Sequence, residues 1–266
     1  MKKRIIGAII ILAIFIPFLL KGGIFFAGLS LILGLIGFKE LYDIRYKEKN
    51  LPLILEILSY LCVSFLIISN YSTQELNLIL GYEVLSLFMI AFLVPIVIIG
   101  DFKKYNLEDA LYLLGSAIFI GLSFNLLISI RNYSLLYLVY FFIITTMTDS
   151  FALFTGMLVG RHKLAPKISP NKTIEGTIGG TIMGTFIASV FYLTVINPDI
   201  NLIILILITT LLSLTGQIGD LVFSAIKRLY GKKDFSNLIP GHGGILDRFD
   251  SIIFVIITAV LFLSII

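Results

Sequence analysis

Long uninterrupted apolar runs constrain this chain more than any other feature of its sequence. The apolar residues are consecutive, without the alternation or three-to-four spacing of soluble strands and helices. Of the 266 residues, 58% are apolar and 14% charged, against roughly 45–50% and about 25% in soluble domains. The single cysteine, Cys62, also excludes an internal disulfide framework. The sequence therefore predicts an all-α, polytopic membrane helical bundle.

About nine transmembrane helices are expected, because a helix needs about 20 apolar residues to cross the hydrocarbon. The runs that approach this length are 5–20, 22–38, 51–69, 76–100, 109–130, 135–160, 174–196, 201–226 and 251–266. A signal peptide is the alternative for the first run, but no small-x-small cleavage site follows it. We therefore expect a retained first helix.

The basic residues predict the orientation of the chain. With nine spans, all of the 20 lysines and arginines except Lys21 and Arg131 fall on one side of the membrane. By the positive-inside rule this side is cytoplasmic, with the N-terminus inside and the C-terminus outside. The net charge of +4 is then an orientation signal. Nucleic acid is not expected as a partner, because the charges lie in separate short loops.

The polar residues divide the chain into two parts. Residues 1–134 form an N-terminal transmembrane region of about five helices, expected to anchor and pack the protein. Residues 135–266 form a C-terminal transmembrane catalytic region with two long cytoplasmic loops, 161–173 and 227–250. The unusual polar residues lie in this second part, so we expect the chemistry there.

Four carboxylates lie more than two residues inside the expected spans, where an ionisable group costs several kcal/mol and usually faces a partner or a cavity. Glu56 and Glu83 lie near the ends of their helices, so an interfacial or structural role is expected for both. Asp149 lies in the polar cluster 145–150, which is either a hydrogen-bonded packing seam or the wall of a cavity open to the cytoplasm. The fourth carboxylate is Asp220.

Asp220 lies late in the eighth expected span. One helical face there carries polar residues at spacings of three, four and three: Gln217, Asp220, Ser224 and Lys227. Asp220 is about 10 Å from Lys227 along this face, at 1.5 Å per residue. That depth disfavours an ordinary solvated helix end and favours a functional role.

The loop 227–250 has the densest set of polar and glycine residues in the chain. Glycines surround His242, and their backbone can approach an anion closely and direct N–H groups at it. Lysines and arginines on both sides offer charge to phosphate oxygens. Asp247 and Asp250 are hard oxygen ligands of the kind that Mg²⁺ prefers. These features together predict a phosphate-handling site.

The loop 161–173 is open to two interpretations. It carries Lys163, Lys167, Ser169, Asn171 and Lys172, which together form either a phosphate cradle or a basic surface for lipid head groups. Thr173 at its end is expected to cap the next helix.

Three segments resemble a known family. Residues 224–250, SAIKRLYGKKDFSNLIPGHGGILDRFD, resemble the signature of the phosphatidate cytidylyltransferases, also called CDP-diacylglycerol synthases. The stretch KLAPKISPNKTIEGTIGG and the pair Gly219-Asp220 are similar to other marked segments of this family. The resemblance covers about residues 141–250, while the first half matches only in hydropathy. The sequence departs from the family pattern at Phe223 and Lys232, and neither departure changes an aspartate of the pattern.

The resemblance implies a reaction in which CTP and phosphatidate give CDP-diacylglycerol and pyrophosphate. It implies Mg²⁺ held by carboxylates that match Asp220 and Asp247, and a second cation, with K⁺ as the candidate. It also implies a homodimer in the cell membrane, with the active site facing the cytoplasm. The reaction suits the residues, because nucleotidyl transfer needs placement and charge neutralisation more than covalent help.

The residues that we assign to this reaction fall into two groups. The catalytic group contains Asp220, Asp247, Lys227, Arg228, His242 and Asp250. The substrate-binding group contains Lys167, Ser169, Asn171, Lys172, Ser224, Gly243, Gly244, Arg248 and Asp149.

Two other classes of membrane protein are alternatives. A cation-coupled transporter would use Asp149 and Asp220 as ion ligands, but it would need access from both sides. The outer loops expected here carry few functional residues. A CDP-lipid-dependent head-group transferase would carry a different spaced aspartate motif, which the sequence lacks. A non-catalytic scaffold is the remaining alternative.

Overall fold

The computed structural model describes residues 13–69, 71, 81–239, 241 and 243–263. Their contacts divide the chain into two compact units. Unit 1 comprises Met1–Tyr133 and Phe235–Ile245, and unit 2 comprises Ser134–Asp234 and Leu246–Ile266. The segment Phe235–Ile245 thus groups with the first half of the chain, although unit 2 surrounds it in sequence.

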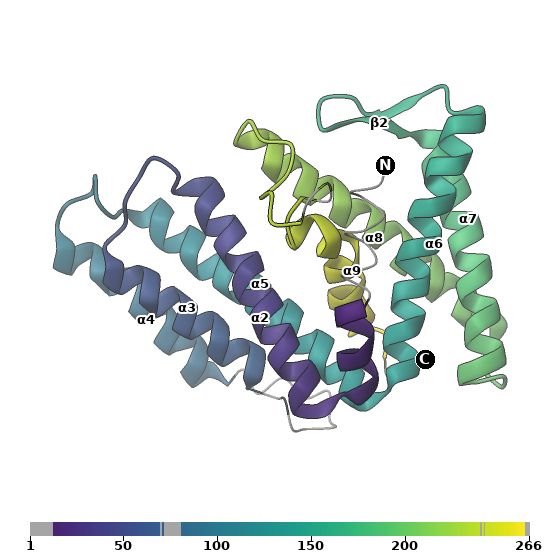
Figure 1. Ribbon diagram of the computed structural model, residues 1–266, viewed down its shortest axis with the longest axis horizontal. Helices are drawn as coiled ribbons and strands as arrows, with labels where there is room; N and C mark the ends of the chain where they lie inside the picture. The colour runs from purple at the N-terminus through teal and green to yellow at the C-terminus, as the bar shows by residue number, and fades with distance from the viewer. Residues whose placement is uncertain (1–12, 70, 72–80, 240, 242, 264–266) are drawn as a thin grey trace. The chain divides into compact units, whose positions relative to one another are not determined.

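Unit 1 is built around one long central helix. Its helices are α2 (Gly23–Arg45), α3 (Leu53–Ile68), α4 (Tyr82–Ile99) and α5 (Leu107–Tyr133), together with helical residues 13–21. The helices α2, α3 and α4 each pack against α5 (Figure 1). The Asn125 amide of α5 donates to the carbonyls of Leu66 and Ile67, at 2.8 and 3.2 Å. These bonds satisfy carbonyls that the end of α3 leaves without helical partners.

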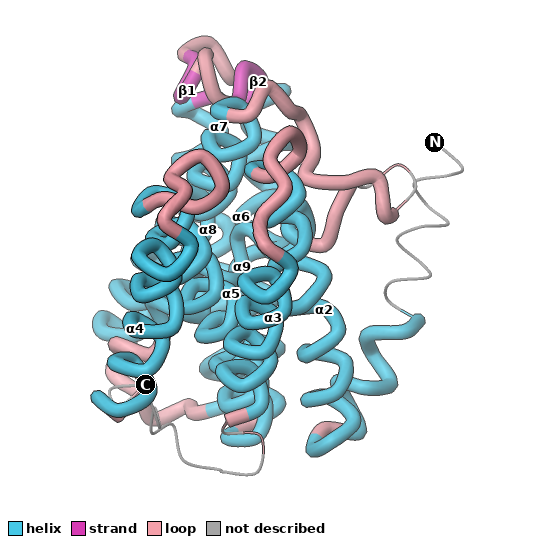
Figure 2. The backbone as a smooth tube through the Cα atoms, turned by 90° about the vertical axis from the view of Figure 1, so that its left-hand side faces the viewer, coloured by secondary structure: helices cyan, strands magenta, loops and turns pink. Residues whose placement is uncertain are grey.

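Unit 2 combines helices with one short hairpin. Its elements are α6 (Leu135–Val159), β1 (Lys163–Ala165), β2 (Ser169–Thr173), α7 (Ile174–Phe191), the π-helical turn Tyr192–Ile196, α8 (Leu202–Leu229) and α9 (Leu246–Ala259). The strands pair antiparallel, with Lys163 opposite Thr173 and Ala165 opposite Ser169, and lie beyond the N-terminus of α7 (Figure 2). The sequence predicted a loop here, because neither short strand has an apolar alternation. The predicted Thr173 cap is confirmed: its hydroxyl accepts from Gly176 N.

Six helices among the described residues are long and apolar enough to cross a membrane. They are α2, α4, α5, α6, α7 with its π-helical continuation, and α8. The apolar helix α3 has 16 residues and α9 has 14, below the usual length of a span. Residues 5–12, half of the expected first span, lie outside the described residues. The all-α polytopic class is confirmed, apart from the small hairpin.

Several helices extend past the apolar spans expected from the sequence. The helix α2 continues to Arg45, α8 continues to Leu229, and α9 begins at Leu246. Hydropathy falls where polar residues begin, but the helical hydrogen bonds continue past that point. Asp247 and Asp250 therefore lie in the first turns of α9, where the sequence placed them in a loop.

Helices α6 and α7 lie side by side (Figure 1). Their close approach is possible because glycines of α7 face α6. A Cβ atom at Gly180 would lie 2.6 Å from the Thr148 carbonyl oxygen and 2.7 Å from the Ala152 Cβ. Small residues are the usual means of close helix contact in lipid, where apolar association has little driving force. Gly180 and the other glycines of α7 that face α6 therefore set the separation of the two helices.

We expect Gly180→Ala to destabilise the protein by about 1–3 kcal/mol, because the added methyl group forces the two backbones apart. The matched control is Gly115→Ala in α5, where a Cβ meets nothing within 4 Å. That change should be neutral or stabilise by about 0.5–1 kcal/mol. Thermal melts in detergent with a thiol-reactive dye measure both, since the single cysteine, Cys62, is buried. If the melting temperature of Gly180→Ala equals or exceeds that of Gly115→Ala, this account of the packing is wrong.

Candidate active site

Three aspartates from three different helices of unit 2 lie close enough to interact electrostatically. Asp149 comes from α6, Asp220 from α8 and Asp250 from α9. The negative charge of Asp220 acts on Asp149 and on Asp250, and the charge of Asp149 also acts on Asp250. Such a concentration of like charge is unfavourable unless cations or bound ligands offset it. We call these three residues the aspartate cluster.

Gly219 explains how α8 brings Asp220 close to α9. A Cβ atom at Gly219 would lie 2.7 Å from the Phe254 Cβ and 2.8 Å from the Asp250 carbonyl oxygen. Any larger residue would therefore separate α8 from α9 at the level of the aspartate cluster. The pair Gly219-Asp220 thus combines a close helix approach with the carboxylate that this approach positions.

Two lysines neutralise carboxylates at the site. Lys172, in β2, places its Nζ 2.6 Å from Asp220 Oδ2, and its charge also acts on Asp149. Lys227, in the last turn of α8, places its Nζ 2.6 Å from Asp247 Oδ1 and also acts on Asp250. The second pair is buried, with side-chain exposures of 9% and 3%. Asp247 is therefore connected to the aspartate cluster through Lys227.

The polar face predicted for α8 divides between two tasks. Ser224 donates a 3.3 Å hydrogen bond to Asp220 Oδ1, one turn away. Gln217 instead donates to Thr181 Oγ1 of α7, at 2.8 Å. Asp220 and Ser224 thus belong to the site, while Gln217 joins α8 to α7.

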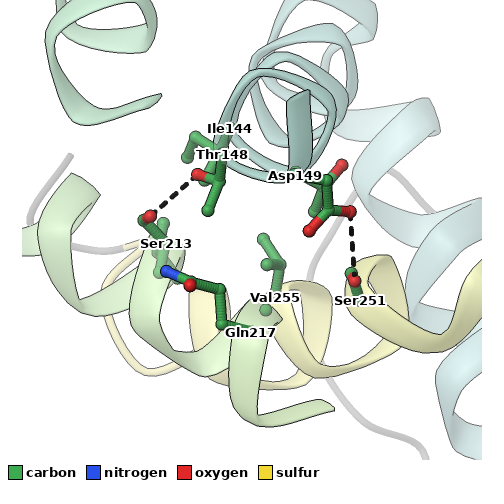
Figure 3. Close-up of a pocket in the computed structure, with 10 residues that line it drawn as sticks. Ile144, Thr148, Asp149, Ser213, Gln217, Ser251 and Val255 are labelled. Atoms are coloured by element: carbon green, nitrogen blue, oxygen red, sulfur yellow. Dashed lines mark hydrogen bonds between the residues drawn. The ribbon is translucent and has the colours of Figure 1, made fainter. Parts of the chain in front are cut away.

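A small pocket adjoins Asp149, as Figure 3 shows. Ser251 donates to Asp149 Oδ2 at 3.5 Å on one side, and Thr148 and Ser213 hydrogen-bond at 2.8 Å on the other. The pocket is too narrow for a water molecule. Within the polar cluster 145–150, Thr148 therefore forms a hydrogen-bonded seam between α6 and α8, and Asp149 places a carboxylate beside the pocket.

The hairpin that carries Lys172 is fixed at its base and at its turn. Glu175 accepts from the backbone N–H groups of Arg161 and His162 and lies 2.6 Å from His162 Nδ1. Arg228 donates to the Ile168 carbonyl at 3.2 Å. Neither His162 nor Glu175 is among the site residues predicted from the sequence. Glu175 is the second residue of α7, and a carboxylate near a helix N-terminus can accept from backbone N–H groups. This position, close to His162, was the sequence signal for such a contact.

Several assigned residues are not joined to the aspartate cluster by any contact that the structure describes. Lys167 and Asn171 are exposed on the hairpin, Ser169 is half-buried there, and Arg248 is exposed on α9. Arg228 contacts backbone carbonyls, where the sequence predicted phosphate. His242 lies outside the described residues.

Gly243 and Gly244 belong to unit 1, where a buried carboxylate of α2 holds their segment. Glu40 Oε1 accepts from Ile245 N at 2.9 Å and from Ser236 Oγ at 2.7 Å. Glu40 is not among the residues predicted from the sequence, because no pattern near it in the chain indicates a partner about 200 residues away.

The donor set suits Mg²⁺, although no group of three or more histidine, cysteine or acidic residues forms a metal centre among the described residues. Mg²⁺ commonly binds one or two carboxylates, with waters and substrate phosphates completing its octahedron. Convergent carboxylates with a serine hydroxyl offer such oxygens. Asp220 and Asp247 are the residues assigned to the metal, and in this structure each has one carboxylate oxygen in contact with a lysine, Lys172 or Lys227.

A family model described as the cytidylyltransferase family matches residues 2–266. The chain is 38% identical to the phosphatidate cytidylyltransferases of Staphylococcus epidermidis and Staphylococcus saprophyticus, and 37% identical to that of Staphylococcus aureus. Each match spans 257 residues and covers 96% of both proteins. The similarity thus includes the first half, which the motifs alone matched only in hydropathy. The chain is a multi-pass membrane protein that belongs to the cytidylyltransferase family.

Proposed function

We propose that this protein is a phosphatidate cytidylyltransferase, which transfers a cytidylyl group from CTP to phosphatidate and releases pyrophosphate. The observation that carries the proposal is the aspartate cluster with Lys172 and Lys227, on the segments that resemble the family signature. Family membership supports the same reaction over the full chain. The product is CDP-diacylglycerol, a precursor for phospholipid synthesis.

The reaction asks for charge control more than for a strong base. A phosphate oxygen of phosphatidate attacks the α-phosphorus of CTP, and the bond from that phosphorus to the β-phosphate oxygen breaks. The lipid phosphate is largely ionised at pH 7, since its second pKa is about 6, so no residue has to remove a proton. Lys172 and Lys227 supply positive charge for the phosphates, and the glycine segment supplies N–H groups.

The same proposal gives roles to the acidic residues. Asp220 and Asp247 would hold Mg²⁺, with Asp149 and Asp250 in support. When bound, the ion supplies positive charge that offsets the charge on the triphosphate. Lys172 would then exchange its contact with Asp220 for a phosphate, because a cation at that carboxylate repels it. We also propose K⁺ as a second cation, as the resemblance implies.

The membrane arrangement is part of this proposal. We place nine spans with the N-terminus in the cytoplasm, a packing region over residues 1–134 and a catalytic region over 135–266. The sorting of basic residues supports this orientation. CTP would then arrive from the cytoplasm and phosphatidate from the inner leaflet, at an active site that faces the cytoplasm. We also propose a homodimer, as the resemblance implies.

Purified protein in detergent is expected to form labelled CDP-diacylglycerol from labelled CTP and phosphatidate when Mg²⁺ is present. Chelation of divalent cations should stop the reaction, and added Mg²⁺ should restore it, because the triphosphate charge is no longer offset without the ion. Thin-layer chromatography of the lipid fraction measures the product. If no lipid-linked cytidylate forms at any Mg²⁺ concentration, the proposed function is wrong.

Asp220→Asn and Asp247→Asn should each lower turnover by more than about 100-fold, beyond the 10–100-fold typical of groups that only support a ligand. The amide keeps the size of the side chain but loses the charge that binds the metal. Glu56→Gln is the matched control, since Glu56 accepts a hydrogen bond from Tyr42 in unit 1. It should keep near-normal turnover. Near-normal turnover of either aspartate variant would remove that residue from the metal site.

Lys227→Met should destabilise the protein by about 3–5 kcal/mol, because it removes the cation that faces the buried Asp247 carboxylate. Lys233→Met is the control, because Lys233 is exposed a few residues further on. Thermal melts in detergent compare the two variants. Equal melting temperatures would show that the buried pair contributes little to stability.

A further inference from the structure

Glu40 is a buried carboxylate in the part of the chain to which the reaction assigns no residue. It lies near the C-terminal end of α2, and only 4% of its surface is exposed. A carboxylate taken out of water is costly unless hydrogen-bond donors or cations replace its hydration. The groups that replace it here identify what Glu40 does.

Its donors come from opposite ends of the segment Phe235–Ile245. Ile245 N–H donates at 2.9 Å and the Ser236 hydroxyl at 2.7 Å, and both reach the same oxygen, Oε1. At Gly244 an added Cβ would lie 2.5 Å from the Glu40 Cδ and 2.6 Å from Oε2. The carboxylate therefore closes the segment into a loop and requires a glycine at position 244.

The described residues of this loop include a closed turn and two left-handed glycines. Ile239 N donates to the Gly243 carbonyl at 2.9 Å, which closes a narrow turn. Gly241 and Gly243 have φ values of 80° and 82°, a region that side-chain-bearing residues rarely adopt. Turns that contain left-handed residues can direct backbone N–H groups into one concavity, which favours phosphate.

We propose that Glu40 is a positioning residue for the triphosphate of CTP. It acts through the backbone of the glycine-rich loop, because a carboxylate in direct contact with a phosphate would be repelled. The inference rests on the proposed function and deepens it: a helix of the first half prepares the loop that binds nucleotide. Without Glu40 the loop samples other conformations, and nucleotide binding has to select the competent one.

Glu40→Ala should raise the KM for CTP by about 10- to 100-fold, the range expected for loss of hydrogen bonds to a charged group. The KM for phosphatidate should change by less than about twofold, because the loop binds nucleotide. Glu40→Gln should keep most of the affinity, since a single amide oxygen can accept from both Ile245 and Ser236. The matched control is Glu56→Gln, which lies in the same unit and contacts Tyr42. It should leave both KM values unchanged.

Hydrogen–deuterium exchange of the membrane-embedded protein gives a readout that is independent of turnover. Peptides that cover 236–246 should exchange faster in Glu40→Ala than in the wild type, and CTP should protect them less. Glu40→Gln and Glu56→Gln should resemble the wild type. If Glu40→Ala fails to accumulate, Ser236→Ala carries the test, because it removes one of the two donors and should raise the KM for CTP alone by a smaller factor.

The outcomes separate this inference from the proposed function. Failure of the wild-type protein to form CDP-diacylglycerol would overturn the proposed function. Normal turnover with an unchanged KM for CTP in Glu40→Ala would overturn only the role of Glu40. Equal rises in both KM values, or a Gln variant as impaired as the Ala variant, would also overturn it, because the effect would then be general or purely electrostatic.

Discussion

Neutralisation of buried charge is the constraint on which this structure depends. Each ion removed from water costs several kcal/mol, and it is tolerated only where a partner of good geometry replaces the water. Lys227 faces Asp247 in this way, Lys172 faces Asp220 in a less buried setting, and Glu40 receives an N–H and a hydroxyl. In each case the partner comes from another element, so the charges also hold those elements together.

Helix packing in this chain follows the rules of lipid more than those of water. Apolar residues gain little by leaving lipid for one another, so close contact and polar pairs have to hold the helices. Gly180 provides the contact between α6 and α7, and Tyr140 hydrogen-bonds Thr209 at 2.6 Å between α6 and α8. Gly219 allows the same kind of close contact between α8 and α9 at the site, and the separation of these helices determines how near Asp220 lies to Asp250.

The sequence predicts the elements well because apolar runs and helices largely coincide. It misses the ends of α2, α8 and α9, because polar residues continue the helices after hydropathy has fallen. Asp220 could be found because a carboxylate is conspicuous inside an apolar run. Glu40 could not, because it lies at a polar helix end and its backbone donor is 205 residues away. The lysine partners also depend on tertiary contacts that no local pattern encodes.

The grouping of Phe235–Ile245 with the first half of the chain has a consequence for biosynthesis. Helices α2 to α5 leave the ribosome long before this segment does, so Glu40 enters the membrane without two of its native donors. Contacts between residues so far apart in sequence form late, because loop closure must precede them. The first part of the chain to be made is therefore among the last to be completed, and a truncated protein would retain a buried carboxylate without those donors.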